Sequence, residues 1–305
     1  MHIIIATQNL FQYPIDCLLE LTSKQIVVAC STGHISLYSI NYATKTLNLD
    51  YKKPRCHSDT ILSLCELDNN RLISSSNDKL IIIWKIFPKE IQLLSVIAAH
   101  SNYVYKISIM HNSNSFLSCS WDKTIKIWNS IDYKLITVLN EYHWVYSCIH
   151  LKYNKHLIIC SCAGKGLSYV SSWNINSKQR VSVFKDIHTN HSGGLLEVNK
   201  ECLAVSKYGV IVLIDPINSI ITGEIKDECI TVASSLTLFK GRITYGSGGY
   251  LCLISLENKE IVFKRNVQKE FRGYYGVLNI NNGKYLIADN NYKGFSIFEF
   301  NDINN

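Results

Sequence analysis

The chain has 305 residues and carries 31 Lys and Arg against 24 Asp and Glu, a formal net charge of +7. Apolar residues make up 47% of it and charged residues only 18%, which excludes a disordered chain and a highly charged tail protein. No apolar run approaches the roughly 18 residues that a membrane-spanning helix needs. Few prolines and many β-branched and aromatic residues favour strands.

The first strand-like segment runs from His2 to Gln8. After it, short alternating strands recur along the whole chain, each ending at an apolar or aromatic anchor. The anchors are Tyr38, Trp84, Trp128, Trp173, Ile214, Ile254 and Phe298. Their spacing, between 40 and 46 residues, is typical of a four-stranded propeller blade. We therefore expect one all-β domain spanning residues 1–305, with blades at about 13–52, 57–97, 100–140, 141–185, 188–225, 228–265 and 271–300.

The last of these units ends five residues before the end of the sequence, with no room for a fourth strand of its own. We expect residues 2–8 to supply that strand on the outside of the seventh blade. This pairing would join the two ends of the domain, close the ring and leave no open end.

Two units match each other closely, at residues 74–84 and 118–128. In both, a Ser precedes an Asp by four positions and a Trp follows that Asp by six. A His stands 21 residues before the first Asp and 22 before the second. This pair of repeats resembles the WD40-repeat family, and the resemblance implies a seven-bladed β-propeller.

The resemblance also implies a structural hydrogen-bonded tetrad in each of these two units. The members would be His57, Ser74, Asp78 and Trp84 in the second blade, and His100, Ser118, Asp122 and Trp128 in the third. A buried carboxylate needs such partners. Because the same four residues recur in neighbouring units, a structural role is preferred to a catalytic one.

The later units depart from the pattern. The fourth lacks the turn Asp, has Glu141 in the position of the tetrad His and carries an insertion at residues 162–168, which we interpret as an extended hairpin turn rather than a phosphate-binding loop. The fifth and sixth lack His, Asp and Trp. Six or eight blades therefore stay open as alternatives to seven.

Other candidate chemistry is sparse. His188 and His191, near Asp186, offer too few ligands for zinc, and a solvated loop is preferred. Phe271-Arg272-Gly273 matches only part of a phosphoinositide-binding motif of one propeller subfamily, because the second arginine is missing. We expect no catalytic residues, no metal and no cofactor, and phosphoinositide binding is disfavoured.

Basic residues gather in two loops, before the second blade and before the seventh. They are Lys52, Lys53, Arg55, Lys264, Arg265, Lys269 and Arg272. Solvated surface charge explains them adequately, while contact with RNA or an acidic peptide stays open.

Aromatic residues mark one face of the ring. Aligning the blades on Ile61, Val104 and Val145 places the next residue of each blade towards the face that carries the Asp turns. We also include the residue before the aligned position and the residue before the turn Asp. Together these positions select Tyr103, Tyr105, Trp121, Trp144, Tyr146 and Tyr275. Tyr and Trp dominate interface hot spots, so we expect a partner-binding patch there; the alternative is that these rings pack on one another or fill the central channel.

These observations predict a non-catalytic scaffold that binds a protein or peptide, as a subunit of a larger complex. An RNA-associated subunit is the alternative, and an enzyme with a site in the central channel is a lesser one. Eleven cysteines without a CxxC pair, and no basic leader, predict reduced thiols in a cytoplasmic protein, with the nucleus possible.

Overall fold

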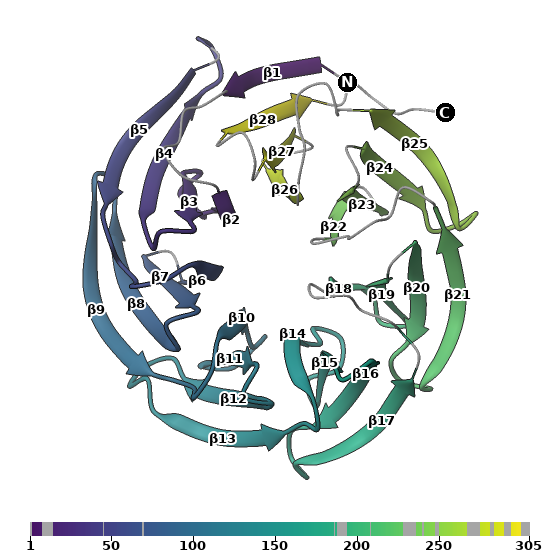
Figure 1. Cartoon of the computed structure of the whole chain (residues 1–305). Helices are drawn as coiled ribbons and strands as arrows, with labels where there is room; N and C mark the ends of the chain where they lie inside the picture. The colour runs from purple at the N-terminus through teal and green to yellow at the C-terminus, as the bar shows by residue number, and fades with distance from the viewer. Residues whose placement is uncertain are drawn as a thin grey trace.

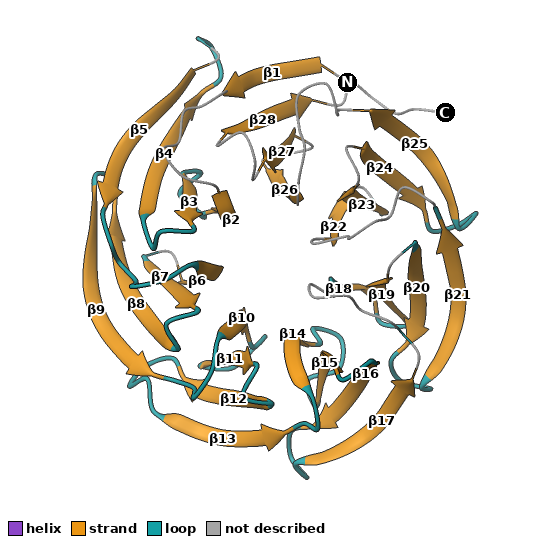
Figure 2. Cartoon of the chain, viewed as in Figure 1, coloured by secondary structure: helices purple, strands orange, loops and turns teal. Residues whose placement is uncertain are grey.

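The computed structural model describes residues 2–7, 15–44, 46–68, 70–185, 187, 194–207, 209–227, 236–239, 241–247, 250–266, 275–280, 284–289 and 294–299. Seven four-stranded antiparallel sheets, here called blades, stand in a ring around a common axis (Figure 1). Strands joined by loops and turns make up the described residues, without a helix (Figure 2). Accordingly, no helix in this part of the chain is long and apolar enough to span a membrane.

Six blades each contain four strands that are consecutive in the sequence. Blades 1 to 3 consist of β2 (Ile15–Glu20), β3 (Ile26–Cys30), β4 (Ile35–Asn41) and β5 (Thr46–Lys53); β6 (Ile61–Asp68), β7 (Arg71–Ser76), β8 (Leu80–Phe87) and β9 (Glu90–Ala98); and β10 (Val104–Ile109), β11 (Ser115–Ser120), β12 (Thr124–Asn129) and β13 (Leu135–Asn140).

Blades 4 to 6 repeat this plan. Their strands are β14 (Trp144–His150), β15 (Leu157–Gly164), β16 (Leu167–Asn174) and β17 (Gln179–Lys185); β18 (Leu195–Asn199), β19 (Cys202–Lys207), β20 (Val210–Asp215) and β21 (Ile220–Lys226); and β22 (Leu236–Phe239), β23 (Arg242–Ser247), β24 (Tyr250–Ser255) and β25 (Glu260–Asn266).

The seventh blade differs because its strands come from both ends of the chain. It contains β26 (Tyr275–Ile280), β27 (Lys284–Asp289) and β28 (Gly294–Glu299), and β1 (His2–Thr7) pairs with β28 as the outer strand. The expectation of ring closure needs a correction. In the described residues every ladder lies within one blade, so hydrogen bonds do not close the ring from blade to blade. The first and last blades instead meet where β2 lies against β26 and β27.

The hydrophobic core lies between blades rather than inside one. All five residues of β3 are buried, whereas β9 at the circumference has one buried residue, Ile91, and is otherwise exposed or half-buried. Each buried cluster draws side chains from two neighbouring blades; Trp128 of blade 3, for example, packs with Ile73 of blade 2. Because sheets buried on both faces need apolar residues at almost every position, the low charge fraction follows from this architecture.

The insertion in blade 4 is a hairpin turn, as predicted. Gly164 pairs with Leu167 across β15 and β16, leaving a two-residue turn of Lys165 and Gly166. Both turn residues have positive φ angles, 53° and 77°, which is the geometry of a tight hairpin connection. The His188–His191 and Phe271–Gly273 segments lie outside the described residues.

Candidate functional site

Five of the six aromatic residues selected from the sequence form one cluster at the inner ends of blades 3 and 4. Tyr103 precedes β10 and Tyr105 lies on it, while Trp121 occupies the turn between β11 and β12. Trp144 and Tyr146 lie on β14. The sixth, Tyr275, begins β26, and its side chain lies outside the described part of the structure.

Trp121 is the centre of this aromatic cluster. Its ring stacks on Trp144 with centroids 5.0 Å apart and on Tyr105 at 5.9 Å. Tyr103 lies tilted against it at 5.2 Å, and Tyr146 meets it edge-on at 5.6 Å. Tyr105 and Tyr146 also contact each other edge-on at 4.9 Å. Such contacts add to the stability gained by burial, so the rings hold one another in place.

The aromatic cluster is well packed, but part of it is exposed to solvent. Tyr146 is 2% exposed, whereas Trp144 is 38% exposed, and Tyr103, Tyr105 and Trp121 are half-buried. The indole Nε1 of Trp121 is buried and has no hydrogen-bond partner among the described residues. A buried N–H without an acceptor is uncommon and costs free energy.

A β-bulge places the two tyrosines of the inner strands. In the ladder between β10 and β11 the register shifts between Val104 and Lys106, so Tyr105 is the extra residue. The same shift in blade 4 falls at Tyr146. A bulge re-aims the side chain it carries, which explains how successive blades turn tyrosines towards the same place. This repeated irregularity was not evident from the sequence, although the alignment selected the residues that occupy it.

Both tetrads are formed in blades 2 and 3. His57 Nδ1 lies 2.8 Å from Asp78 Oδ2, and its Nε2 lies 2.7 Å from Ser74 Oγ. Trp84 Nε1 donates to the same Ser74 oxygen at 2.8 Å. The corresponding distances for His100, Ser118, Asp122 and Trp128 in blade 3 are also 2.8, 2.7 and 2.8 Å.

The electrostatics of the tetrads fit a structural role. Burial raises the pKa of Asp78, but hydrogen bonds from His57 and from the Leu80 and Ser58 amides outweigh it, so the pKa lies below its ordinary value. Burial lowers the pKa of His100 more than its bond to Asp122 raises it. The polar side-chain atoms of both tetrads are hydrogen-bonded within their own blade, although His57 and Asp78 also line a cavity between blades 1 and 2.

Blade 4 contains a different buried network around Glu141. Its Oε1 accepts hydrogen bonds from Trp173 Nε1 and Ser171 Oγ, both at 2.5 Å, and from Cys160 Sγ at 3.3 Å. Its Oε2 accepts from Tyr169 at 2.8 Å and from Arg180 at 2.6 Å. The sequence placed Glu141 in the position of the tetrad His but did not reveal its partner Arg180, which lies 39 residues later.

Among the described residues, one group of metal-ligating side chains is close enough to hold a metal ion. It consists of Glu141, Cys160 and Cys162, whose ligand atoms lie within 4.8 Å of one another. The donors around Glu141 leave its oxygens no free position. Burial raises the pKa of the Cys160 thiol well above its usual range, which disfavours the thiolate that a metal requires. These residues therefore fit the network better than a metal.

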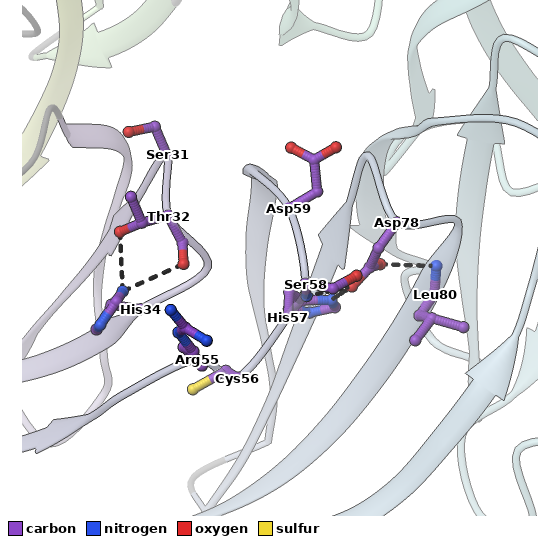
Figure 3. A pocket seen from close by; sticks show the side chains of 10 residues that line it. All are labelled: Ser31, Thr32, His34, Arg55, Cys56, His57, Ser58, Asp59, Asp78 and Leu80. Atoms are coloured by element: carbon purple, nitrogen blue, oxygen red, sulfur yellow. Dashed lines mark hydrogen bonds and ion pairs between the residues drawn. The ribbon is translucent and has the colours of Figure 1, made fainter.

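A cavity of about 690 Å³ opens between blades 1 and 2 (Figure 3). Three segments line it: the turn between β3 and β4 with Ser31, Thr32 and His34; the connection from β5 to β6 with residues 55–59; and the start of β8 with Asp78 and Leu80. The cavity is on the same face as the aromatic cluster, because both are built from loops that enter an inner strand and from the following turns.

The prediction that the basic residues lie in loops was wrong for four of them, because Lys52 and Lys53 end strand β5 and Lys264 and Arg265 lie on β25. Some are also engaged within the protein. Lys264 Nζ donates to Asp227 at 2.8 Å, and Lys53 Nζ lies 5.9 Å from the Trp84 ring centroid. Lys269 and Arg272 lie outside the described residues. RNA binding by these loops stays a prediction.

The comparisons with known proteins agree with this geometry. The family model for the WD domain, G-beta repeat (WD40), matches residues 50–85 and 91–129, which correspond to blades 2 and 3 with their tetrads. The WD40 β-propeller domain of Doa1 superposes with a TM-score of 0.78 at 17% sequence identity, covering 96% of this chain and 95% of that one. The chain therefore contains two WD40 repeats and has the fold of a WD40 β-propeller.

Curated WD40 relatives match shorter segments. The ubiquitin homeostasis protein lub1 of Schizosaccharomyces pombe is 33% identical over 72 residues, covering 24% of this chain and 10% of that protein. RACK1, a small ribosomal subunit protein of the same organism, is 33% identical over 78 residues (24% and 25%). The p21-activated protein kinase-interacting protein 1-like of Gallus gallus is 31% identical over 143 residues (47% and 34%). The matched segments thus span a third or less of these relatives, and their activities are not assigned to this WD40 protein.

Proposed function

We propose that this WD40 propeller is a non-catalytic scaffold that binds a protein or peptide on the aromatic cluster of blades 3 and 4. WD40 propellers are generally protein-interaction scaffolds without enzymatic activity, and the fold supports that broad role. The partner surface is the finer proposal. We further propose that the protein acts in the cytoplasm, within a larger complex.

The observation that carries the proposal is the stacking of Trp144, which is exposed, on Trp121, which is held by its neighbours. Trp144 presents 38% of its surface to solvent while stacked on a ring that is itself fixed by three tyrosines. A fixed aromatic surface loses little conformational entropy on binding, and it contributes large apolar area.

The test is affinity purification with mass spectrometry from the native cell, comparing wild type with Trp144→Ala. Trp144 is chosen because it lies at the exposed edge of the aromatic cluster, so its removal leaves the central stack of Trp121 on Tyr105. Tyr153→Ala is the matched control, since Tyr153 is 57% exposed at the opposite end of β14. We expect partners to be lost from Trp144→Ala and kept by Tyr153→Ala. Full retention of partners by Trp144→Ala would reject the surface.

A further inference from the structure

The cavity between blades 1 and 2 is lined by Arg55, which has an unusual backbone conformation. Ten non-glycine residues with positive φ are found in the described structure, and nine of them lie in hairpin turns between consecutive strands of one blade. Arg55, with φ of 46°, is the one in a connection between blades. Such a conformation costs about 1 kcal/mol or more for a non-glycine residue and persists only where the surroundings enforce it.

Gly33 enforces this conformation. Its carbonyl oxygen accepts hydrogen bonds from the amides of Cys56 at 2.7 Å and His57 at 3.2 Å, which hold the connection against the turn of blade 1. A Cβ atom at position 33 would lie 2.1 Å from the His57 carbonyl oxygen, so the approach requires glycine. The backbone that follows Arg55 is therefore fixed, and the Arg55 side chain extends into the cavity between His34 and His57 (Figure 3).

The guanidinium of Arg55 has no part in the contacts that the described residues make with one another. No hydrogen bond or ion pair to it is present within the described residues. The other charged groups of the cavity are engaged: Asp78 accepts from His57, Ser58 and Leu80, and Asp59 accepts from the Thr60 amide at 2.6 Å. An arginine held in a strained backbone position, without an internal partner, is suited to bind an anion from outside.

We propose that Arg55 binds the carboxylate of an acidic side chain in the partner peptide, as a second contact point on the same face as the aromatic cluster. The proposal rests on the proposed function, because it assumes a partner on this face. A carboxylate fits the guanidinium fork with two parallel hydrogen bonds, and the hydroxyls of Ser31 and Ser58 line the same cavity.

A phosphate group fits the cavity less well. Recognition of phosphorylated residues generally uses clusters of arginines, whereas this cavity supplies one guanidinium. Two carboxylates, Asp59 and Asp78, also line it, and they repel a dianion more strongly than a monoanion. These charges select the monocarboxylate.

The experiment follows the Arg55 guanidinium by NMR in protein labelled with ¹⁵N-arginine, its signal assigned by its loss in Arg55→Lys. The probe is N-acetyl-L-glutamate α-amide, and N-acetyl-L-glutamine α-amide is the matched neutral control. We expect a saturable shift of the Arg55 signal with the glutamate compound and none with the glutamine compound. A third titration uses N-acetyl-phosphoserine amide, for which we expect weaker binding.

Three results would overturn the proposal: no saturable shift with the glutamate compound, an equal shift with the glutamine compound, or tighter binding of phosphoserine. The titration uses the wild-type protein without any partner, so its outcome is independent of the capture experiment with Trp144→Ala. If Arg55 shows no saturable shift but Trp144→Ala loses its partners, only the Arg55 proposal is rejected. If Arg55 binds the glutamate compound but Trp144→Ala keeps its partners, only the aromatic surface is rejected.

Discussion

Arg180, on the outer strand of blade 4, donates a hydrogen bond at 2.6 Å to the carboxylate of Glu141, whose side chain is fully buried. In blades 2 and 3 the buried carboxylate belongs instead to an Asp in a turn and is paired with a His. Blade 4 has Lys165 and Gly166 in that turn, without an Asp, and the negative charge is at the position of the His instead. The same part of the blade is thus stabilised by a different charge pair.

We expect strong coupling between Glu141 and Arg180. Glu141→Gln leaves Arg180 without its counter-charge, and loss of one partner of a buried pair costs about 3 kcal/mol of unfolding free energy. The double variant with Arg180→Gln should be more stable than the sum of the single losses predicts, by about 1–3 kcal/mol in urea denaturation. The exposed pair Lys134–Asp132, at 3.4 Å, is the control and should show almost no coupling. Additive losses at Glu141 and Arg180 would contradict the account.

The tetrad of blade 3 makes Ser118 important for stability. Ser118→Ala removes the oxygen that lies between His100 Nε2 and Trp128 Nε1, leaving two buried nitrogens without partners. We expect a loss of about 2–4 kcal/mol of unfolding free energy, since each unsatisfied buried group costs about 1–3 kcal/mol. The exposed Ser101→Ala should change stability by less than about 0.5 kcal/mol. A loss at Ser118 as small as that control would argue against the tetrad.

Stability should fall in mild acid because of His150. Its Nδ1 accepts from the His111 amide at 3.0 Å and its Nε2 donates to the Lys155 carbonyl at 2.9 Å, so the ring is neutral. Burial lowers the pKa of His150 more than the Lys155 hydrogen bond raises it. As the pH falls below the ordinary histidine pKa of about 6.5, the unfolded chain takes up a proton that the folded chain resists, so unfolding becomes easier.

The measurement is the free energy of unfolding as a function of pH. His150→Gln, which does not titrate, should give a flatter decline between about pH 6.5 and 5 than wild type. His156→Gln, at an exposed position of the neighbouring turn, is the matched control and should follow the wild-type slope. Equal slopes for wild type and His150→Gln would exclude His150 as the source.

Gly33 should tolerate no larger residue. Gly33→Ala places a Cβ against the His57 carbonyl and puts Ala at φ of 74°, so we expect a loss of at least about 2 kcal/mol of unfolding free energy. Gly166→Ala is the control. Gly166 has a similar φ of 77°, but no atom lies within 4 Å of the added Cβ, so we expect a loss of only about 1 kcal/mol of unfolding free energy. Similar losses in the two variants, measured by denaturation, would show that the close approach at Gly33 carries no strain of its own.

Features that recur in each repeat could be predicted from the sequence, whereas contacts that depend on strand pairing or on a neighbouring blade could not. The resemblance carried by the spacing of Ser, Asp and Trp placed Ser118 and Asp122 in a tetrad, because Ser118 lies on β11 and Asp122 lies in the turn that directly follows it. Alignment on Val104 and Val145 likewise selected the aromatic cluster. Arg180 and Arg55 carried no such signal, since their roles depend on strand pairing in blade 4 and on the approach of Gly33 across a blade boundary.

The most direct test of the aromatic cluster as the partner surface is hydroxyl-radical footprinting of the native complex. Side-chain oxidation of Trp144 and Tyr103 would be compared between the free protein and the complex, with the exposed Tyr153 as internal reference. We predict that binding reduces oxidation of Trp144 and Tyr103 several-fold while Tyr153 is unchanged. Unchanged oxidation of Trp144 and Tyr103 in a complex that has formed would contradict the account.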